Sequence, residues 1–133
     1  MTVLKLSKVA FVAALWVFAL AQSAFAMKTV PYEATAFKAA QDAGQPLLID
    51  VYAPWCSTCR AQHQALEGIK DKPEFEKVTV FQVDYDTQKD AMQAFNVNQR
   101  STLIGFKGAT ETGRFTGVTD PIEIEKLVNS VVK

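Results

Sequence analysis

The stretch LLIDVYAPWCSTC, residues 47–59, decides the fold of this chain. It opens with a nearly continuous apolar run, which is typical of a strand that is buried on both faces of a sheet. It closes with Cys56 and Cys59, which are separated by two residues and are the only cysteines in the sequence. The residues that follow have the composition of a helix that ends near Gly68. The cysteine pair therefore lies where a buried strand passes directly into a helix.

This position favours redox chemistry for the two cysteines. The first turn of a helix offers unpaired N–H groups and the positive end of the helix dipole, which together stabilise a thiolate. The thiolate is the form of cysteine that attacks a disulfide. We therefore expect Cys56 to be the exposed attacking residue. Cys59, one helical turn later, should lie deeper and close the disulfide.

Other uses of the pair remain open. A structural zinc site needs four ligands, and the chain offers one cysteine pair and a single histidine, His63. A purely structural disulfide between Cys56 and Cys59 would close a loop too small to stabilise the chain much by lost entropy. A carrier of copper or of an iron–sulfur centre, built on these cysteines with help from His63, is the main alternative because thiolates are soft ligands.

Outward from this stretch, the chain alternates helices and strands. The pattern predicts a helix at residues 32–46, before the central strand. After the cysteine helix it predicts a strand at 77–86 and a short helix at 87–95, capped by Thr87. A hairpin follows, with strands at 101–108 and 112–118. A last helix has Asp120 as N-cap, Pro121 in its first position and Glu123 completing a capping box. This order predicts an α/β fold with a central mixed sheet and helices on both faces.

The first 26 residues differ from the rest. Lys5 and Lys8 precede an uncharged apolar run that ends at Ala24-Phe25-Ala26. This is the pattern of a secretory signal peptide. The apolar run is shorter than the ~20 residues of a membrane-spanning helix, so an uncleaved anchor is the less favoured alternative.

Cleavage before Met27 would divide the chain into a signal peptide, residues 1–26, and one domain, residues 27–133. Export predicts a periplasmic or secreted protein in an oxidising compartment. Without the two lysines of the leader, the domain has 12 basic and 14 acidic residues and a formal charge of −2, so we expect no nucleic-acid partner and no membrane contact apart from an uncleaved leader.

The order of elements and the motif WCSTC after an apolar strand resemble the thioredoxin family. The resemblance extends over essentially all of residues 27–133, and FKG (106–108) and Gly117 also fall where the family pattern expects them. It implies the thioredoxin fold and disulfide exchange with partner proteins through Cys56 and Cys59, by a monomer that needs no cofactor. It also implies, for an exported member, a membrane protein that supplies electrons. We expect a reductase rather than an oxidase, because the domain is small and has no inserted helical lid.

The resemblance assigns roles to further residues. Asp50 matches the family's buried acid behind the second cysteine, which implies that it accepts the proton of Cys59; a strand-end acid that reaches water is the alternative. From its place before Cys56, Trp55 is expected to shield the cysteines and to offer an apolar surface to partner polypeptides, with simple packing as the alternative. His63 is expected to be an ordinary position on the helix surface; a residue that tunes Cys59 or assists a metal is the alternative.

The chain departs from the family at two positions. Ser101, preceded by Arg100, stands where the family has a cis-proline, and Gln64 stands where it has a helix-kinking proline. A cis bond before a residue other than proline costs ~2.5–4 kcal/mol. We therefore predict a trans Arg100–Ser101 bond, or else a strained cis bond held by its surroundings. The backbone at both residues is expected to pair with an extended substrate segment.

Overall fold

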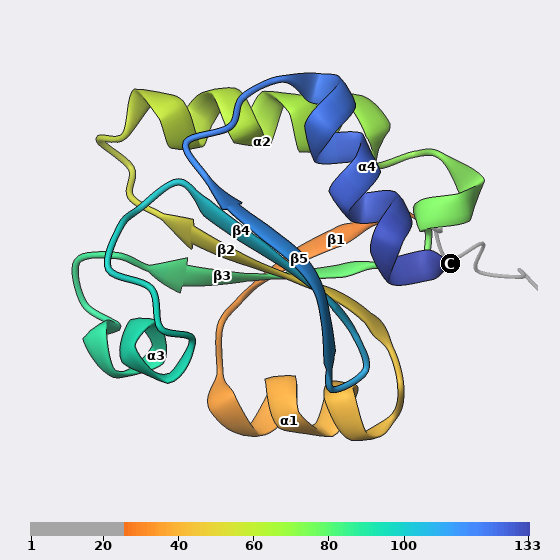
Figure 1. The fold of residues 1–133 in the computed structure, drawn as a ribbon, viewed down its shortest axis with the longest axis horizontal. Helices are drawn as coiled ribbons and strands as arrows, with labels where there is room; N and C mark the ends of the chain where they lie inside the picture. The colour runs from red at the N-terminus through yellow and green to blue at the C-terminus, as the bar shows by residue number, and fades with distance from the viewer. Residues whose placement is uncertain (1–25) are drawn as a thin grey trace, which may run out of the picture.

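The computed structural model describes residues 26–133, which form a five-stranded sheet with helices on both faces (Figure 1). The strands are β1 (Lys28–Pro31), β2 (Pro46–Tyr52), β3 (Thr79–Asp84), β4 (Thr102–Lys107) and β5 (Thr110–Thr116). The helices are α1 (Ala34–Asp42), α2 (Ser57–Ile69), α3 (Lys89–Ala94) and α4 (Pro121–Val132), with a 3₁₀ turn η1 (Pro73–Phe75). The predicted fold class is confirmed.

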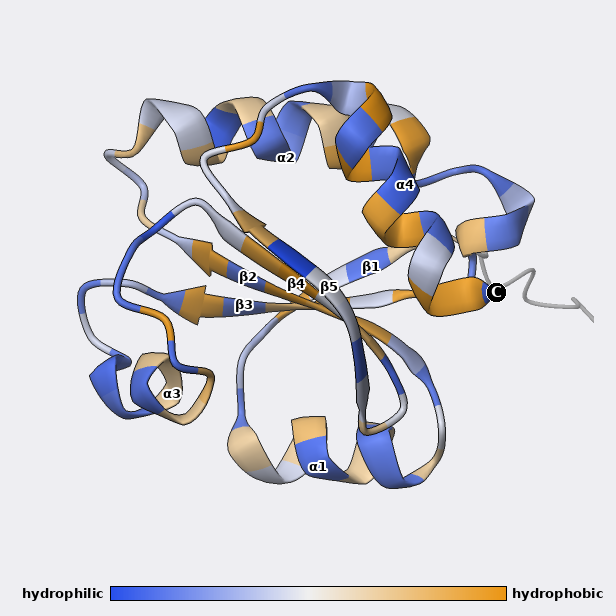
Figure 2. Ribbon diagram, in the orientation of Figure 1, coloured by the Kyte–Doolittle hydropathy of each residue, from blue (hydrophilic) through white to orange (hydrophobic). Residues whose placement is uncertain are grey.

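Strand β2 lies at the centre of the sheet. The strand order is β1-β3-β2-β4-β5, and β2 runs parallel to β3 and antiparallel to β4. Because both neighbours satisfy its backbone and helices cover both of its faces, residues 47–51 are fully buried. The apolar run in the sequence thus reflects this central position, and Figure 2 shows the hydrophobic residues along the central strands.

Each face of the sheet has its own core. In Figure 1, α2 and α4 lie above the sheet and α1 and α3 lie below it. Leu48 belongs to the core under α2 and α4, whereas Leu47 and Ile49 belong to the core on the other face. Since side chains alternate along a strand, Asp50 shares the face of Leu48 and points toward α2. The sheet therefore directs this acid toward the helix that carries the cysteines.

The structure adds one strand and corrects two predicted helix starts. Strand β1 was not predicted, because it is short and only one of its four residues is half-buried. Thr87 does not cap α3; its N-cap is Gln88, and the Asp84 carboxylate instead accepts the N–H of Thr87. Glu123 accepts a bond from Lys126 and none from the N–H of Asp120, so the predicted capping box does not form. Asp120 does cap α4, by accepting the N–H of Ile122.

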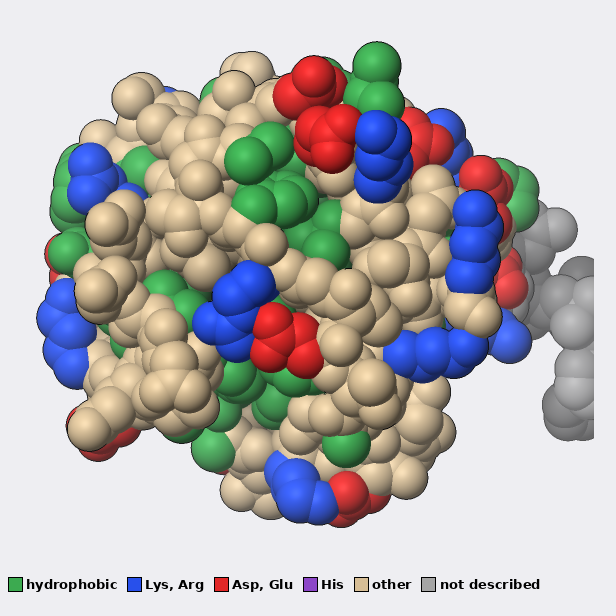
Figure 3. Space-filling view, viewed as in Figure 1, with side chains coloured by type: hydrophobic (Ala, Val, Ile, Leu, Met, Phe, Trp, Pro, Cys, Tyr) green, Lys and Arg blue, Asp and Glu red, His purple; other side chains and the backbone are tan. Residues whose placement is uncertain are grey.

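The predicted signal peptide lies outside the described residues apart from Ala26, and its cleavage stays a prediction. Among residues 26–133, no helix has both the length and the apolar character needed to cross a bilayer. The face shown in Figure 3 carries acidic and basic side chains interspersed rather than sorted by sign.

Candidate active site

The two cysteines lie at the start of α2, as the sequence predicted. Cys56 is the N-cap of the helix, and its Sγ accepts the backbone N–H of Cys59 at 3.1 Å. The two residues form a disulfide with a Cα–Cα distance of 5.3 Å. A sulfur in the N-cap position takes the place of the oxygen that usually satisfies this first turn. The same N–H is thus ready to stabilise a thiolate when the disulfide opens.

The sulfur of Cys56 is more covered than expected. Cys56 is 3% exposed and Cys59 is 0% exposed, so the prediction of an exposed attacking residue is wrong for the disulfide form, although Cys59 is the deeper of the two. Ala53, Tyr52 and Tyr85 pack around the two cysteines, and the Oγ of Ser101 lies 3.1 Å from the Sγ of Cys56 and 3.3 Å from the Sγ of Cys59. One hydroxyl therefore contacts both sulfurs.

The loop at Ser101 is held by its backbone. No cis peptide bond occurs within residues 26–133, so the Arg100–Ser101 bond is trans, the first of the two predicted states. Ser101 has a φ of 59°, in the left-handed region that residues with a side chain seldom adopt. Its N–H donates to the Val51 carbonyl at 2.8 Å, and its own carbonyl accepts the N–H of Gly117 at 2.8 Å. The unusual φ at this position is compensated by these two bonds, and a proline could not donate the first of them.

Gln62 holds the same loop from α2, and the sequence reading missed it. The residue is fully buried, and its amide nitrogen donates to the carbonyls of Ser101 at 3.0 Å and Val118 at 2.9 Å. Its Oε1 has no partner among the described residues. The sequence did contain a signal for this role. Gln62 falls between Cys59 and Leu66 on the buried face of the helix, and a polar side chain that is buried there must find hydrogen-bond partners.

Asp50 and His63 form the most buried ionisable contact of the site. Asp50 is 0% exposed, as predicted, and its Oδ2 lies 2.5 Å from Nε2 of His63. Its Oδ1 has no partner among the described residues. The prediction that His63 is an ordinary surface position is wrong: its ring stacks on Tyr52 with centroids 4.4 Å apart, and the Gln82 amide lies 3.3 Å from Nε2. Helical spacing places His63 one turn beyond Cys59, directly over the acid of β2.

Contact with Asp50 raises the pKa of His63. The hydrogen bond to Asp50 is the largest cause; burial opposes it, and the negative charges of Asp50 and Glu67 add to it. The stabilisation that the pair gives to the fold is therefore present in full below the ordinary histidine pKa of 6.5 and is lost as the pH rises through the raised value.

The chain has one histidine, so this pKa is directly measurable by NMR. We expect the His63 imidazole to titrate above 6.5, and the Asp50→Asn variant to titrate at lower pH because it loses the carboxylate charge. The free energy of unfolding of the wild type should fall, relative to that of Asp50→Asn, as the pH rises through the measured pKa of His63. A wild-type titration at or below the ordinary pKa would contradict this interpretation.

An exposed aromatic surface lies beside the disulfide. Trp55 is 54% exposed, and its Nε1–H donates to Oδ2 of Asp86 at 2.9 Å. The guanidinium of Arg100 lies 4.8 Å from the centroid of the indole ring. The structure thus brings Trp55, Arg100 and Ser101 together at the cysteines, although they are far apart in the sequence. Asp86, which orients the indole, is a second residue that the sequence reading missed.

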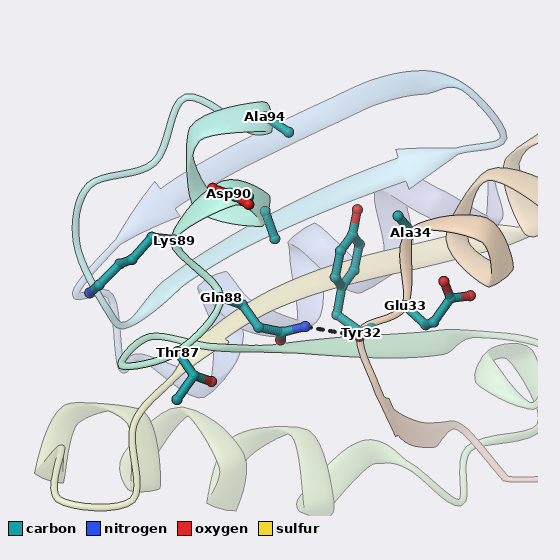
Figure 4. A pocket seen from close by; sticks show the side chains of 9 residues that line it. Tyr32, Glu33, Ala34, Thr87, Gln88, Lys89, Asp90 and Ala94 are labelled. Carbon is teal, nitrogen blue, oxygen red and sulfur yellow. Dashed lines mark hydrogen bonds between the residues drawn. The ribbon is translucent and has the colours of Figure 1, made fainter.

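The hollow in Figure 4 lies away from this site. It measures about 510 Å³ and lies between the start of α1 and the start of α3, where Gln88 donates to the Tyr32 carbonyl at 3.1 Å. None of the predicted site residues lines it.

The donor set for a metal is small. Within the described part of the chain, no group of three or more histidine, cysteine or acidic residues is arranged to hold a metal ion. His63, which the carrier alternative would recruit, is engaged by Asp50. The residues present therefore do not extend the cysteine pair into a metal site.

Comparisons with known proteins agree with the geometry. The sequence model of the thioredoxin family matches residues 28–130. The chain is 32% identical over 83 residues to the thioredoxin of Chlamydia trachomatis, covering 62% of this chain and 79% of that protein. It is 28% identical over 97 residues to the thioredoxin of Alicyclobacillus acidocaldarius, covering 73% of this chain and 91% of that protein.

Solved structures give the same result. The crystal structure of Trxlp from Edwardsiella tarda superposes with a TM-score of 0.72 at 40% identity, covering 76% of this chain and 97% of that chain. A thioredoxin O2 from Arabidopsis thaliana, solved in its oxidized state, superposes with a TM-score of 0.65 at 26% identity, covering 79% of this chain and 95% of that chain. With Cys56 and Cys59 joined at the head of α2, this chain belongs to the thioredoxin family and is a thioredoxin-like thiol–disulfide oxidoreductase.

Proposed function

We propose that the protein is an extracytoplasmic reductase of protein disulfides, with Cys56 as nucleophile, Cys59 as resolving cysteine and Asp50 as proton acceptor. One observation carries the assignment of Cys56 as the nucleophile: its Sγ occupies the N-cap of α2, where the N–H of Cys59 and the hydroxyl of Ser101 both lie within 3.1 Å. Two donors at this distance favour the thiolate over the thiol.

The reaction takes two steps. The Cys56 thiolate attacks one sulfur of a partner disulfide, forming a mixed disulfide and releasing the other sulfur as a thiolate. Cys59 then loses its proton to Asp50 and attacks Cys56, which breaks the mixed disulfide and releases the second partner sulfur as a thiolate. The partner gains two electrons, Cys56 and Cys59 lose two, and the released thiolates take protons from water.

Partner polypeptides would dock on the surface that Trp55 and Arg100 form beside Ser101, which is itself buried. The indole offers apolar area, and the guanidinium beside it is exposed. The N–H and carbonyl of Ser101 are already bonded inside the protein, so its hydroxyl is the group that would face a partner's sulfur. The Arg100 backbone would then carry the pairing with an extended segment.

The location and the electron source rest on the leader. A signal peptide ending at Ala26 would export the domain to the periplasm or outside the cell. An oxidising compartment keeps a cysteine pair as a disulfide unless something reduces it. A reductase there needs an electron donor in the membrane, and the protein would act on its partners as a monomer, since both cysteines and Asp50 lie in one domain.

The direction and the location are tested together in cells. Acid quenching followed by alkylation should find Cys56 and Cys59 mostly reduced, in the exported fraction, on a chain that begins at Met27. A reduced C59A variant should accumulate mixed disulfides on Cys56 with its partners, whereas C56A/C59A should accumulate none. A pair found mostly oxidised in the cell would favour an oxidase, and a chain retained in the cytoplasm would refute export.

A further inference from the structure

The Asp50 carboxylate is sealed from water. It is 0% exposed, Oδ2 contacts only His63, and Oδ1 has no partner among the described residues. Burial of a carboxylate is costly unless an opposite charge compensates it. If Asp50 serves Cys59 as proposed above, the carboxylate needs such a charge beside it, and the proton that it takes must later leave.

His63 lies where both tasks can be done. It follows Cys59 by four residues on α2, so helical periodicity places both side chains on the face that packs against β2. Its Nε2 lies 2.5 Å from Asp50, while its side chain remains 29% exposed. Stacking on Tyr52 fixes the ring between the buried acid and solvent.

We propose that His63 is a positioning residue that supplies the counter-charge of the Asp50 carboxylate and passes the proton of Cys59 from Asp50 to solvent. This inference rests on the proposed role of Asp50. In the resting couple, an imidazolium faces a carboxylate and the net charge is zero. When Asp50 takes the proton of Cys59, the imidazolium loses its counter-charge and releases a proton to water, so the couple stays neutral. Transfer of the Asp50 proton to the neutral imidazole then restores the ion pair.

The groups that face His63 support this assignment. Asp50 and Tyr52 contact it from β2, Gln82 contacts it from β3, and Glu67 lies one turn further along α2. Two of the four are carboxylates, and no Lys or Arg contributes to its titration. The raised pKa of His63 agrees with an imidazolium in this position.

The test is H63Q, measured by stopped flow with excess Ellman's reagent on the reduced protein. Glutamine keeps an amide donor for Asp50 but does not titrate. The phase that depends on reagent concentration reports attack by Cys56, and the concentration-independent phase reports attack by Cys59. We expect an unchanged first phase. The rate of the second phase should fall about tenfold at pH 6.5. This is less than the whole rate acceleration of ~10²–10⁴-fold that a positioned acid–base group contributes, because Asp50 is still present. The deficit should disappear at high pH, where hydroxide takes the proton of Cys59 directly.

Two controls make the outcome decisive. D50N should slow the second phase by at least as much, and D50N/H63Q should be no slower than D50N, because the two residues act as one unit. A second phase in H63Q that matches wild type, or that is slowed equally at every pH, would overturn the inference. Failure of the first phase in wild type would instead refute the proposed function. If H63Q does not fold, the same measurement is made on H63N, because the asparagine side chain also does not titrate.

Discussion

Proline at position 101, the residue that the family resemblance implies there, is expected to destabilise this protein by ~3 kcal/mol or more. Proline has no N–H, so Ser101→Pro removes the hydrogen bond to the Val51 carbonyl and leaves this acceptor buried. Its ring also holds φ near −65°, whereas Ser101 has a φ of 59°. The loop would have to be rebuilt over both sulfurs.

Urea unfolding of the oxidised protein measures this effect, and Ser101→Gly is the matched control. Glycine keeps the N–H and tolerates a positive φ, so the control should lie within ~1 kcal/mol of wild type even though it lacks the hydroxyl. If Ser101→Pro were as stable as Ser101→Gly, the trans, left-handed loop described here would not be the state that the chain stabilises.

Loss of Gln62 has the second large effect on stability. Gln62→Leu conserves the approximate volume but removes the donor that the carbonyls of Ser101 and Val118 share. The Ser101 carbonyl keeps the N–H of Gly117, and the unpartnered Oε1 disappears, so part of the cost is offset. We expect a net loss of ~2 kcal/mol in the free energy of unfolding.

Gln64→Leu is the matched control for this prediction. It makes the same substitution two residues away on α2, at an exposed position, and should change the free energy of unfolding by no more than ~0.5 kcal/mol. Equal effects at the two positions would show that the bonds to Ser101 and Val118 do not stabilise the loop.

Much of the fold was predictable because its signals are local. Residues 47–51 read as a buried strand, Asp120 and Pro121 read as a helix start, and both predictions are confirmed. The placement of Cys56 and Cys59 at the head of α2 follows from the same kind of pattern. Strand β1 escaped prediction because an edge strand of four mostly exposed residues carries little hydrophobic signal.

The chemistry around the cysteines was less predictable. His63 looked like a surface residue because its neighbours in the sequence are polar, and nothing in α2 shows that Asp50 of β2 lies beneath it. Gln62 and Ser101 are 39 positions apart, and their bond requires α2 and the loop before β4 to be packed together first. The sequence did identify Ser101 as unusual, but not how its loop is held.

By itself, the sequence determined the order of strands and helices from α1 onward, the position of the cysteine pair at a helix start and membership of the thioredoxin family. These features depend on hydrophobic periodicity, on caps and on a contiguous motif, all of which act between residues close along the chain. Only the tertiary structure decided which groups surround the sulfurs and the buried acid: Ser101 over both sulfurs, Gln62 behind that loop, and His63 against Asp50. Hydrogen bonds form over about 3 Å, and separate elements come within that distance of each other only after the sheet and helices have packed.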